Sequence, residues 1–226
     1  MEEKNYRVLR IEEQLYGCEE LPEGQPVLCD VLLEAADGTL RDHRLTKAAH
    51  KVYFTRHGET VWNVENKICG MTDSPLTEKG RAQARELGEK LRTSGLRIDE
   101  ILYSPLSRAA DTARAIAEAT GIPARCEPRL REQCFGRYEG TPRDGEEFRI
   151  SKTHFADRYS GGESMMQLAQ RIYNLLDELR ADTDKTYLLV AHNGIARVVQ
   201  SYFYDMTNEE YAAAGIKNCE FVEFTF

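Results

Sequence analysis

Two histidine-containing stretches, far apart in the chain, carry the residue types best suited to chemistry. The first is 55–60 (Thr-Arg-His-Gly-Glu-Thr), with Arg56 and His57, and the second is 191–194 (Ala-His-Asn-Gly), with His192. A neutral imidazole is a nucleophile that can form a covalent phospho-intermediate at neutral pH. An arginine donates forked hydrogen bonds to phosphate oxygens in a geometry that lysine cannot match. Together these residue types indicate phosphoryl transfer.

Three further residues suit the same reaction. Asn63 follows the first histidine closely and offers a neutral hydrogen-bond donor, and Arg108 opens a predicted helix that follows a strand. Glu132 is the best candidate for the proton carrier, as general acid toward the leaving alkoxide and then as general base toward water. At the start of its own predicted helix, His192 adds a donor beside the positive end of the helix dipole. These groups would stabilise a transferring phosphoryl group.

Each histidine is positioned by a short apolar run that predicts a buried strand. The run 51–54 (Lys-Val-Tyr-Phe) precedes His57, and the run 187–191 (Tyr-Leu-Leu-Val-Ala) precedes His192. Such runs, rich in β-branched and aromatic residues, are typical of buried strands. Because ligands of open α/β sheets bind outside the carboxyl ends of the strands, we expect both histidines at one ligand-binding edge.

From residue 51 onward, strand and helix patterns alternate. Thr77 is a good N-cap for the first long helix, although Gly80 leaves its capping box incomplete. The alternation predicts a three-layer α/β/α fold, in which helices cover both faces of a mostly parallel sheet. Beyond the two strands already named, the predicted strands are 98–103 and 222–226, and the predicted helices are 77–92, 107–119, 163–181 and from 193 or 194 to about 205.

Residues 1–48 differ from the rest and predict a small β-rich extension, with a main domain at 49–226. Partly alternating runs at 6–15, 27–33 and 39–45 predict about three strands, and Asp37-Gly38 is a typical hairpin signal. A sheet of this size is insecure alone, so we expect it to pack on the main domain or on a second copy in a homodimer.

Composition narrows the class of protein. The chain has 226 residues, 41% of them hydrophobic and 30% charged, which is ordinary for a globular domain. We expect no membrane contact and a cytoplasmic location, because no apolar run is long enough to span a bilayer and the start does not resemble a signal peptide. A net charge of −8 argues against nucleic acid as a partner. The six scattered cysteines predict no zinc site.

The order of four segments resembles the histidine phosphatase superfamily, the phosphoglycerate mutase-like proteins. The resemblance covers roughly residues 50–226, through 55–63, 104–113, 130–140 and 191–194, with further landmarks at 73–80 and 161–164. It implies that His57 is phosphorylated and that Glu132 carries the proton, as the first glutamate of a Glu-x-x-Phe-Gly-x-x-Glu-Gly pattern. It also implies that the phosphoryl group is held by Arg56, Asn63, Arg108 and His192.

The expected activity is hydrolysis of a small phosphorylated metabolite, without metal or cofactor. Specificity should lie in 140–161, which is either a lid beside the site or a surface helix with paired charges. The mutases of the family hold the substrate carboxylate with an adjacent arginine pair, and this chain has no such pair. Phosphoglycerate mutase-type transfer and an inactive phosphate-binding scaffold are the alternatives. Within the same motifs, we expect Glu139 to support its loop and Thr60 to cap or contact the pocket.

Overall fold

The computed structural model describes residues 6–13, 28–35, 40–46 and 50–226. The chain divides into two compact units, Met1–Ala49 and His50–Phe226. In the first unit the described residues form an antiparallel sheet in the order β1-β2-β3. Its strands are β1 (Tyr6–Glu13), β2 (Leu28–Ala35) and β3 (Leu40–Thr46). The hairpin turn expected at Asp37-Gly38 lies outside the described residues.

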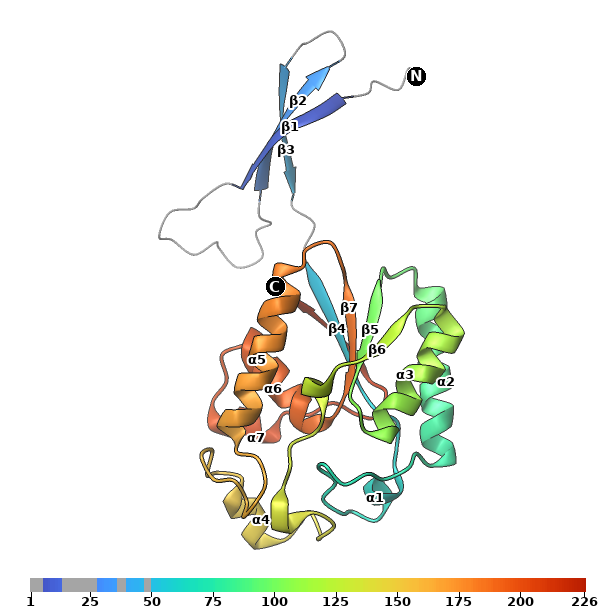
Figure 1. The fold of residues 1–226 in the computed structure, drawn as a ribbon, viewed down its shortest axis with the longest axis vertical. Helices are drawn as coiled ribbons and strands as arrows, with labels where there is room; N and C mark the ends of the chain where they lie inside the picture. The colour runs from blue at the N-terminus through green and yellow to red at the C-terminus, as the bar shows by residue number, and fades with distance from the viewer. Residues whose placement is uncertain (1–5, 14–27, 36–39, 47–49) are drawn as a thin grey trace. The chain divides into compact units, whose positions relative to one another are not determined.

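The second unit is built on a five-stranded sheet in the order β6-β5-β7-β4-β8 (Figure 1). The pairs β4·β7, β7·β5 and β5·β6 are parallel, and only β8 runs antiparallel, beside β4. The mostly parallel sheet expected from the sequence is therefore confirmed. The strands are β4 (Lys51–Arg56), β5 (Glu100–Tyr103), β6 (Ala124–Cys126), β7 (Tyr187–Ala191) and β8 (Phe221–Thr225).

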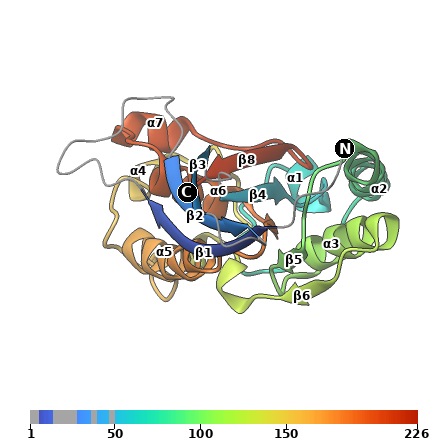
Figure 2. The same ribbon diagram turned by 90° about the horizontal axis from the view of Figure 1, so that it is seen from above.

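Helices cover both faces of this sheet, which confirms the three-layer prediction (Figure 2). Successive residues of β7 point to opposite layers: Leu188 packs with the helices α2 and α3, whereas Leu189 packs with α5 and α6. This alternation follows from the two-residue period of a strand. The four helices are α2 (Glu78–Ser94), α3 (Ser107–Thr120), α5 (Met165–Ala181) and α6 (Asn193–Phe203).

The helix starts follow local hydrogen bonding. The Thr77 hydroxyl accepts from the Gly80 N–H at 3.0 Å, as its predicted N-cap role requires. The helix predicted from residue 163 begins two residues later, because Ser164 caps it in a full capping box with Gln167. Short elements without a clear sequence period were not predicted: α1 (Val61–Val64), α4 (Glu146–Ser151), α7 (Asn208–Ala213), and the 3₁₀ turns η1 (Pro128–Leu130) and η2 (Gly136–Tyr138).

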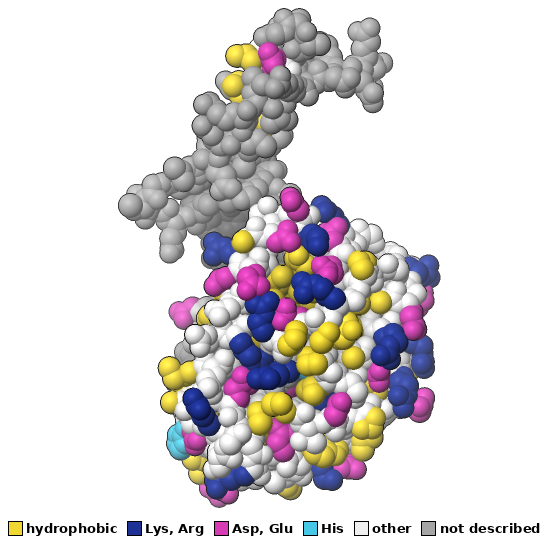
Figure 3. All heavy atoms as spheres, viewed as in Figure 1, with side chains coloured by type: hydrophobic (Ala, Val, Ile, Leu, Met, Phe, Trp, Pro, Cys, Tyr) yellow, Lys and Arg dark blue, Asp and Glu magenta, His cyan; other side chains and the backbone are white. Residues whose placement is uncertain are grey.

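The surface carries charges of both signs. On the face drawn in Figure 3, basic and acidic side chains are interspersed, with hydrophobic side chains between them. Within the described part of the chain, no helix has both the length and the apolar character needed to cross a bilayer.

Candidate active site

The central strands β4 and β7 bring the two predicted histidines together. Arg56 lies opposite Ala191 in the parallel register, so His57 and His192 leave the sheet side by side. The His57 N–H donates to the Ala191 carbonyl at 3.0 Å, and the two imidazole centroids are 5.2 Å apart. Both side chains are buried. The site therefore lies at the carboxyl edge of the sheet, where the sequence predicts it.

His57 is a neutral imidazole whose second ring nitrogen has no hydrogen-bond partner among the described residues. Its Nδ1 lies 2.7 Å from the Gly58 carbonyl oxygen, which can only accept, so Nδ1 carries the proton. Nε2 is then the atom with a lone pair. Burial lowers the pKa of His57 well below 6.5, and the positive charges of Arg108 and Arg56 lower it further. A buried neutral imidazole with an unprotonated Nε2 is a suitable nucleophile.

The turn after His57 depends on a close approach between two backbones. A Cβ on Gly58 would lie 2.4 Å from the carbonyl oxygen of Gly80, at the start of α2. Only glycine fits at this distance. The Gly58 N–H also donates to the Thr112 hydroxyl at 3.1 Å, which ties the turn to α3. Together, α2 and α3 fix the position of the histidine.

Asn63 and Thr60 form a reciprocal cap on α1. The Thr60 hydroxyl accepts from the Asn63 N–H, and Asn63 Oδ1 accepts from the Thr60 N–H, both at 3.2 Å. Asn218 Nδ2 also donates to the His57 carbonyl at 2.8 Å. With its oxygen engaged in the cap, Asn63 retains its amide N–H groups for a ligand in the adjoining cavity. Thr60 thus acts as the cap, one of its two expected roles.

Arg56 projects a partly unsatisfied guanidinium toward the same place. Its Nη1 donates to the Ile216 carbonyl at 3.1 Å, while its buried Nε has no hydrogen-bond partner among the described residues. Burial lowers the pKa of Arg56 to about 10, and the neighbouring Arg143 contributes to this shift. A buried N–H without a partner is costly, so this arginine is suited to binding an anion.

Arg108 and His192 form a second pair beside His57. Arg108 Nε donates to His192 Nδ1 at 3.2 Å, so the His192 proton lies on Nε2, which donates to the Ser104 hydroxyl at 2.6 Å. Burial lowers the pKa of His192 well below 6.5, with Arg108 adding to the effect. The other Arg108 nitrogens donate to the carbonyls of Gly70 and Thr72.

Glu139 supports the loop that holds Arg108. Its carboxylate accepts hydrogen bonds from the N–H groups of Gly70, Met71 and Thr72 at 3.0–3.1 Å. It also accepts from the Phe135 N–H at 2.9 Å. The expected loop-supporting role of Glu139 is therefore confirmed by its contacts.

Glu132 is buried at the N-terminus of α6. One carboxylate oxygen accepts from the Gln133 N–H at 2.9 Å, and the other accepts from the Gly194 N–H at 3.0 Å. The first N–H groups of a helix have no partner within the helix, so they are available to hold a carboxyl group there. These contacts fix Glu132 in the wall of a cavity that His57 also lines.

This polar cavity has a volume of ≈ 130 Å³ and is lined by His57, Arg56, Asn63 and Glu132. Arg108 and His192, although adjacent to His57, do not line it. Of the six residues predicted for the site, the structure places four in the cavity wall, whereas His192 lies beside His57 and Arg108 is bonded to His192.

Three cations in the polar cavity were not predicted as site residues: Arg143, Lys152 and Arg197. Arg197 lies four residues after Asn193, so the two share one face of α6, and this spacing was the available signal. Arg143 and Lys152 flank α4 in the segment 140–161. Burial lowers the pKa of Lys152 to about 8, and the charges of Arg197 and Arg143 add to the shift.

These three cations and Arg56 make the cavity strongly positive. Among the described residues, none of the four forms an ion pair with a carboxylate. Glu132 is the only carboxylate that lines the cavity in the described part of the chain. Such a cavity attracts an anion and concentrates the field on it.

The segment 140–161 contributes to the wall of the site. Phe148, on α4, is buried against Phe135 at 5.3 Å between ring centroids, in a cluster that includes Tyr138 and Tyr159. The aromatic cluster anchors α4 beside the polar cavity. Of the two interpretations of this segment, the contacts favour the one that places it at the site.

The chain is similar to a known protein family and to individual bacterial proteins. The model of the histidine phosphatase superfamily (branch 1) matches residues 52–226. The chain is 43% identical over 154 residues to a probable phosphoglycerate mutase of Enterobacter sp. (strain 638), covering 65% of this chain and 70% of the relative. A Yersinia pestis (strain Pestoides F) protein of the same description is 34% identical over 177 residues, covering 75% and 81%.

Two solved structures have the same fold. A mycobacterial glucosyl-3-phosphoglycerate phosphatase, solved with VO3, aligns with a TM-score of 0.67 at 30% identity, covering 77% of this chain and 90% of its own. A putative alpha-ribazole-5'-P phosphatase from Escherichia coli str. K-12 substr. MG1655 aligns with a TM-score of 0.68 at 24% identity, covering 79% and 91%. At that identity, the second comparison supports the fold alone.

Proposed function

Because this chain is an enzyme of the histidine phosphatase superfamily (branch 1), we propose that it hydrolyses small phosphate monoesters through a phosphohistidine at His57. The observation that carries the proposal is the state of that imidazole. His57 is neutral, its Nδ1–H is bonded to the Gly58 carbonyl, and its Nε2 has no hydrogen-bond partner in the described part of the chain. It lines a cavity whose other walls supply cations and one carboxylate.

In the first step, His57 Nε2 attacks the phosphorus atom. The N–P bond forms while the ester P–O bond breaks, and Glu132 gives its proton to the departing alkoxide. Arg56 and Asn63 donate hydrogen bonds to the equatorial oxygens, where charge is concentrated in the transition state. Phosphate binding by Arg108 and His192 is also part of this proposal, and it requires that the Arg108–His192 and His192–Ser104 hydrogen bonds be exchanged for bonds to the phosphoryl oxygens.

In the second step, water attacks the phosphorus of phospho-His57. Glu132, now a carboxylate, takes the proton from the water, the N–P bond breaks, and inorganic phosphate leaves. Glu132 thereby recovers its proton, and His57 returns to its neutral form. The positive charge that this reaction needs is supplied by protein cations, so the proposal requires no metal ion or other cofactor.

Phosphoglycerate mutase-type transfer is the second candidate, and similarity to the two bacterial relatives, both probable phosphoglycerate mutases, favours it. In that reaction the phosphoryl group returns from His57 to the substrate instead of to water. The absence of an adjacent arginine pair in the sequence and the phosphatase at 30% identity favour hydrolysis. A coupled assay for interconversion of 2- and 3-phosphoglycerate distinguishes the two reactions.

The direct test is phosphate release from a panel of phosphomonoesters in EDTA, with the parent, His57→Ala and His154→Ala. His154 is exposed and lies outside the polar cavity, so it is the matched control. We expect release by the parent and the control, and a loss of at least about 10³-fold in kcat for His57→Ala. A loss of less than about tenfold would contradict the nucleophile role. Binding of vanadate without any turnover by the parent would support the scaffold alternative.

A further inference from the structure

A second, larger cavity opens from the polar cavity. This apolar cavity has a volume of ≈ 450 Å³ and shares four lining residues with the polar one: Phe135, Lys152, Gly194 and Arg197. The volumes of the two cavities can be compared with the usual size of a pocket that binds a small molecule. Pockets that bind small molecules usually measure about 300–1,000 Å³, so the polar cavity alone is small for a ligand and the apolar cavity is of ordinary size.

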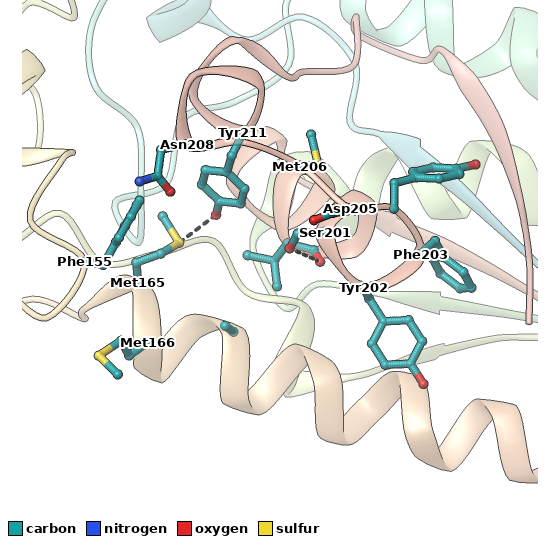
Figure 4. A pocket seen from close by; sticks show the side chains of 13 residues that line it. Phe155, Met165, Met166, Ser201, Tyr202, Phe203, Asp205, Met206, Asn208 and Tyr211 are labelled. Carbon is teal, nitrogen blue, oxygen red and sulfur yellow. Dashed lines mark hydrogen bonds between the residues drawn. The ribbon is translucent and has the colours of Figure 1, made fainter. Parts of the chain in front are cut away.

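Part of the wall of the apolar cavity is aromatic, and charged side chains complete it: Arg149, Lys152, Arg197 and Glu209. Phe155 and Tyr211 pack edge to face with their centroids 6.3 Å apart. The Tyr211 hydroxyl donates to Met165 Sδ at 2.7 Å, a contact drawn in Figure 4. Tyr159 lines the same cavity and is buried. Aromatic rings and thioethers form favourable surfaces for apolar or aromatic groups.

The proton carrier lies at the boundary between the two cavities. Glu132 lines the polar cavity and accepts a hydrogen bond from Gly194, and Gly194 lines both cavities. The ester oxygen that receives the Glu132 proton must lie within hydrogen-bonding reach of this carboxylate. A substrate whose phosphoryl group lies at His57 therefore extends its alcohol past Gly194 into the apolar cavity.

We propose that the apolar cavity binds the leaving group, so that the preferred substrates are phosphate monoesters of bulky, largely apolar alcohols at least as large as a fused aromatic ring. This inference rests on the proposed phosphatase function. A further cavity adjoins the apolar cavity. Beyond Phe155, Met165, Asn208 and Tyr211, which line both spaces, a further cavity of ≈ 580 Å³ opens and gives room for a longer alcohol (Figure 4).

The test compares 2-(naphthalen-1-yl)ethyl phosphate with ethyl phosphate. Both are esters of primary alcohols, so the chemistry of the leaving oxygen is nearly the same and the difference reports binding in the cavity. We expect the kcat/KM of the naphthyl ester to exceed that of ethyl phosphate by about thirtyfold or more, since even one methylene in an apolar pocket is worth about tenfold. A ratio near one would overturn the inference. Loss of ethyl phosphate hydrolysis in His57→Ala tests the proposed function separately.

Two neighbouring alanines on α7 provide a matched pair of variants. Ala212 lines the apolar cavity and Ala213 does not, and both are exposed. In Ala212→Trp the indole fills part of the cavity, and we expect the naphthyl-to-ethyl ratio of kcat/KM to fall about tenfold. In Ala213→Trp the ratio should stay at the parent value. Equal ratios in the two variants would contradict the assignment of the cavity.

A binding measurement covers the case in which a variant is poorly active. The product alcohol, 2-(naphthalen-1-yl)ethanol, should compete with ethyl phosphate in the parent and in Ala213→Trp. Competition should be about tenfold weaker in Ala212→Trp, because the indole occupies the same space. Failure of this alcohol to compete in the parent would also overturn the inference.

Discussion

The Glu132 carboxylate and the backbone of Gly194 are in closer contact than any side chain at position 194 would allow. The Gly194 N–H donates to one carboxylate oxygen at 3.0 Å, and a Cβ on residue 194 would lie 2.4 Å from the other. The helix α6 therefore does two things at its first turn: it orients Glu132 and leaves space for it. The glycine two residues after His192 is therefore required by the position of the proton carrier.

Gly194→Ala should therefore impair catalysis by displacing Glu132. We expect kcat to fall by at least about 10²-fold, the lower end of the usual contribution of a general acid or base. Gly145→Ala is the matched control, because a Cβ there meets only the Pro142 carbonyl oxygen at an ordinary 3.4 Å. Thermal unfolding of both variants shows whether they are folded. A folded Gly194→Ala enzyme with parental kcat would contradict this function of the glycine.

Glu132→Gln should discriminate between leaving groups. An alkoxide needs a proton as it departs, whereas p-nitrophenolate is stable without one. We expect kcat/KM for ethyl phosphate to fall about 10²–10⁴-fold and that for p-nitrophenyl phosphate to fall much less. The kcat/KM ratio reports the phosphorylation step, in which Glu132 acts as the acid. Equal losses for the two esters would mean that Glu132 does not protonate the leaving group.

Much of the site could be predicted because it depends on strand order and local turns. His57 and His192 each follow an apolar run, and parallel strands end at one edge, so their proximity follows from the pattern alone. The Thr77 cap also depends on short-range geometry, since its partner Gly80 lies three residues later. Glu139 differs, because three of its four hydrogen bonds among the described residues reach residues 70–72, far away in the sequence.

The remaining cations depend on tertiary packing that no local pattern encodes. Arg143 and Lys152 flank α4, whose Phe148 packs against Phe135, and Arg143 also donates to the Lys67 carbonyl. Arg108 was expected among the phosphate ligands, yet in this structure its guanidinium donates to His192 and to loop carbonyls. The apolar cavity could not be predicted for the same reason, because its wall is formed by segments that are distant in the sequence.

The two buried histidines should make the folded state sensitive to acid. Their pKa values lie well below 6.5 in the folded protein, because burial and the nearby arginines oppose the imidazolium form. Below about pH 6.5 the unfolded chain binds protons at these histidines that the folded chain does not. The free energy of unfolding is therefore unaffected by them above that pH and decreases as the pH falls below it. Each histidine contributes up to about 1.4 kcal/mol per pH unit to the decrease in the free energy of unfolding.

Urea unfolding between about pH 7 and pH 5 measures this effect. The free energy of unfolding should fall toward low pH in the parent, and the fall should be smaller in His57→Asn, which cannot take up a proton there. His154→Asn, at an exposed position, should behave like the parent. If His57→Asn shows the parental pH dependence, the buried imidazole at position 57 is not the cause of the acid sensitivity.

Lys152 should contribute to anion affinity in a pH-dependent way. Its pKa is lowered to about 8 by burial and by two arginine neighbours, so it is largely charged at neutral pH and largely uncharged well above pH 8. Lys152→Met should raise the inhibition constant of inorganic phosphate about fivefold near pH 7, because one nearby cation is lost. The difference in inhibition constant between the parent and the variant should shrink as the pH rises, because Lys152 loses its charge. Bound phosphate stabilises the charged lysine, so this loss occurs at a higher pH in the complex than in the free enzyme. Lys90→Met, on the exposed face of α2, is the control and should leave the constant unchanged. A variant that keeps parental affinity at neutral pH would show that Lys152 does not act on the bound anion.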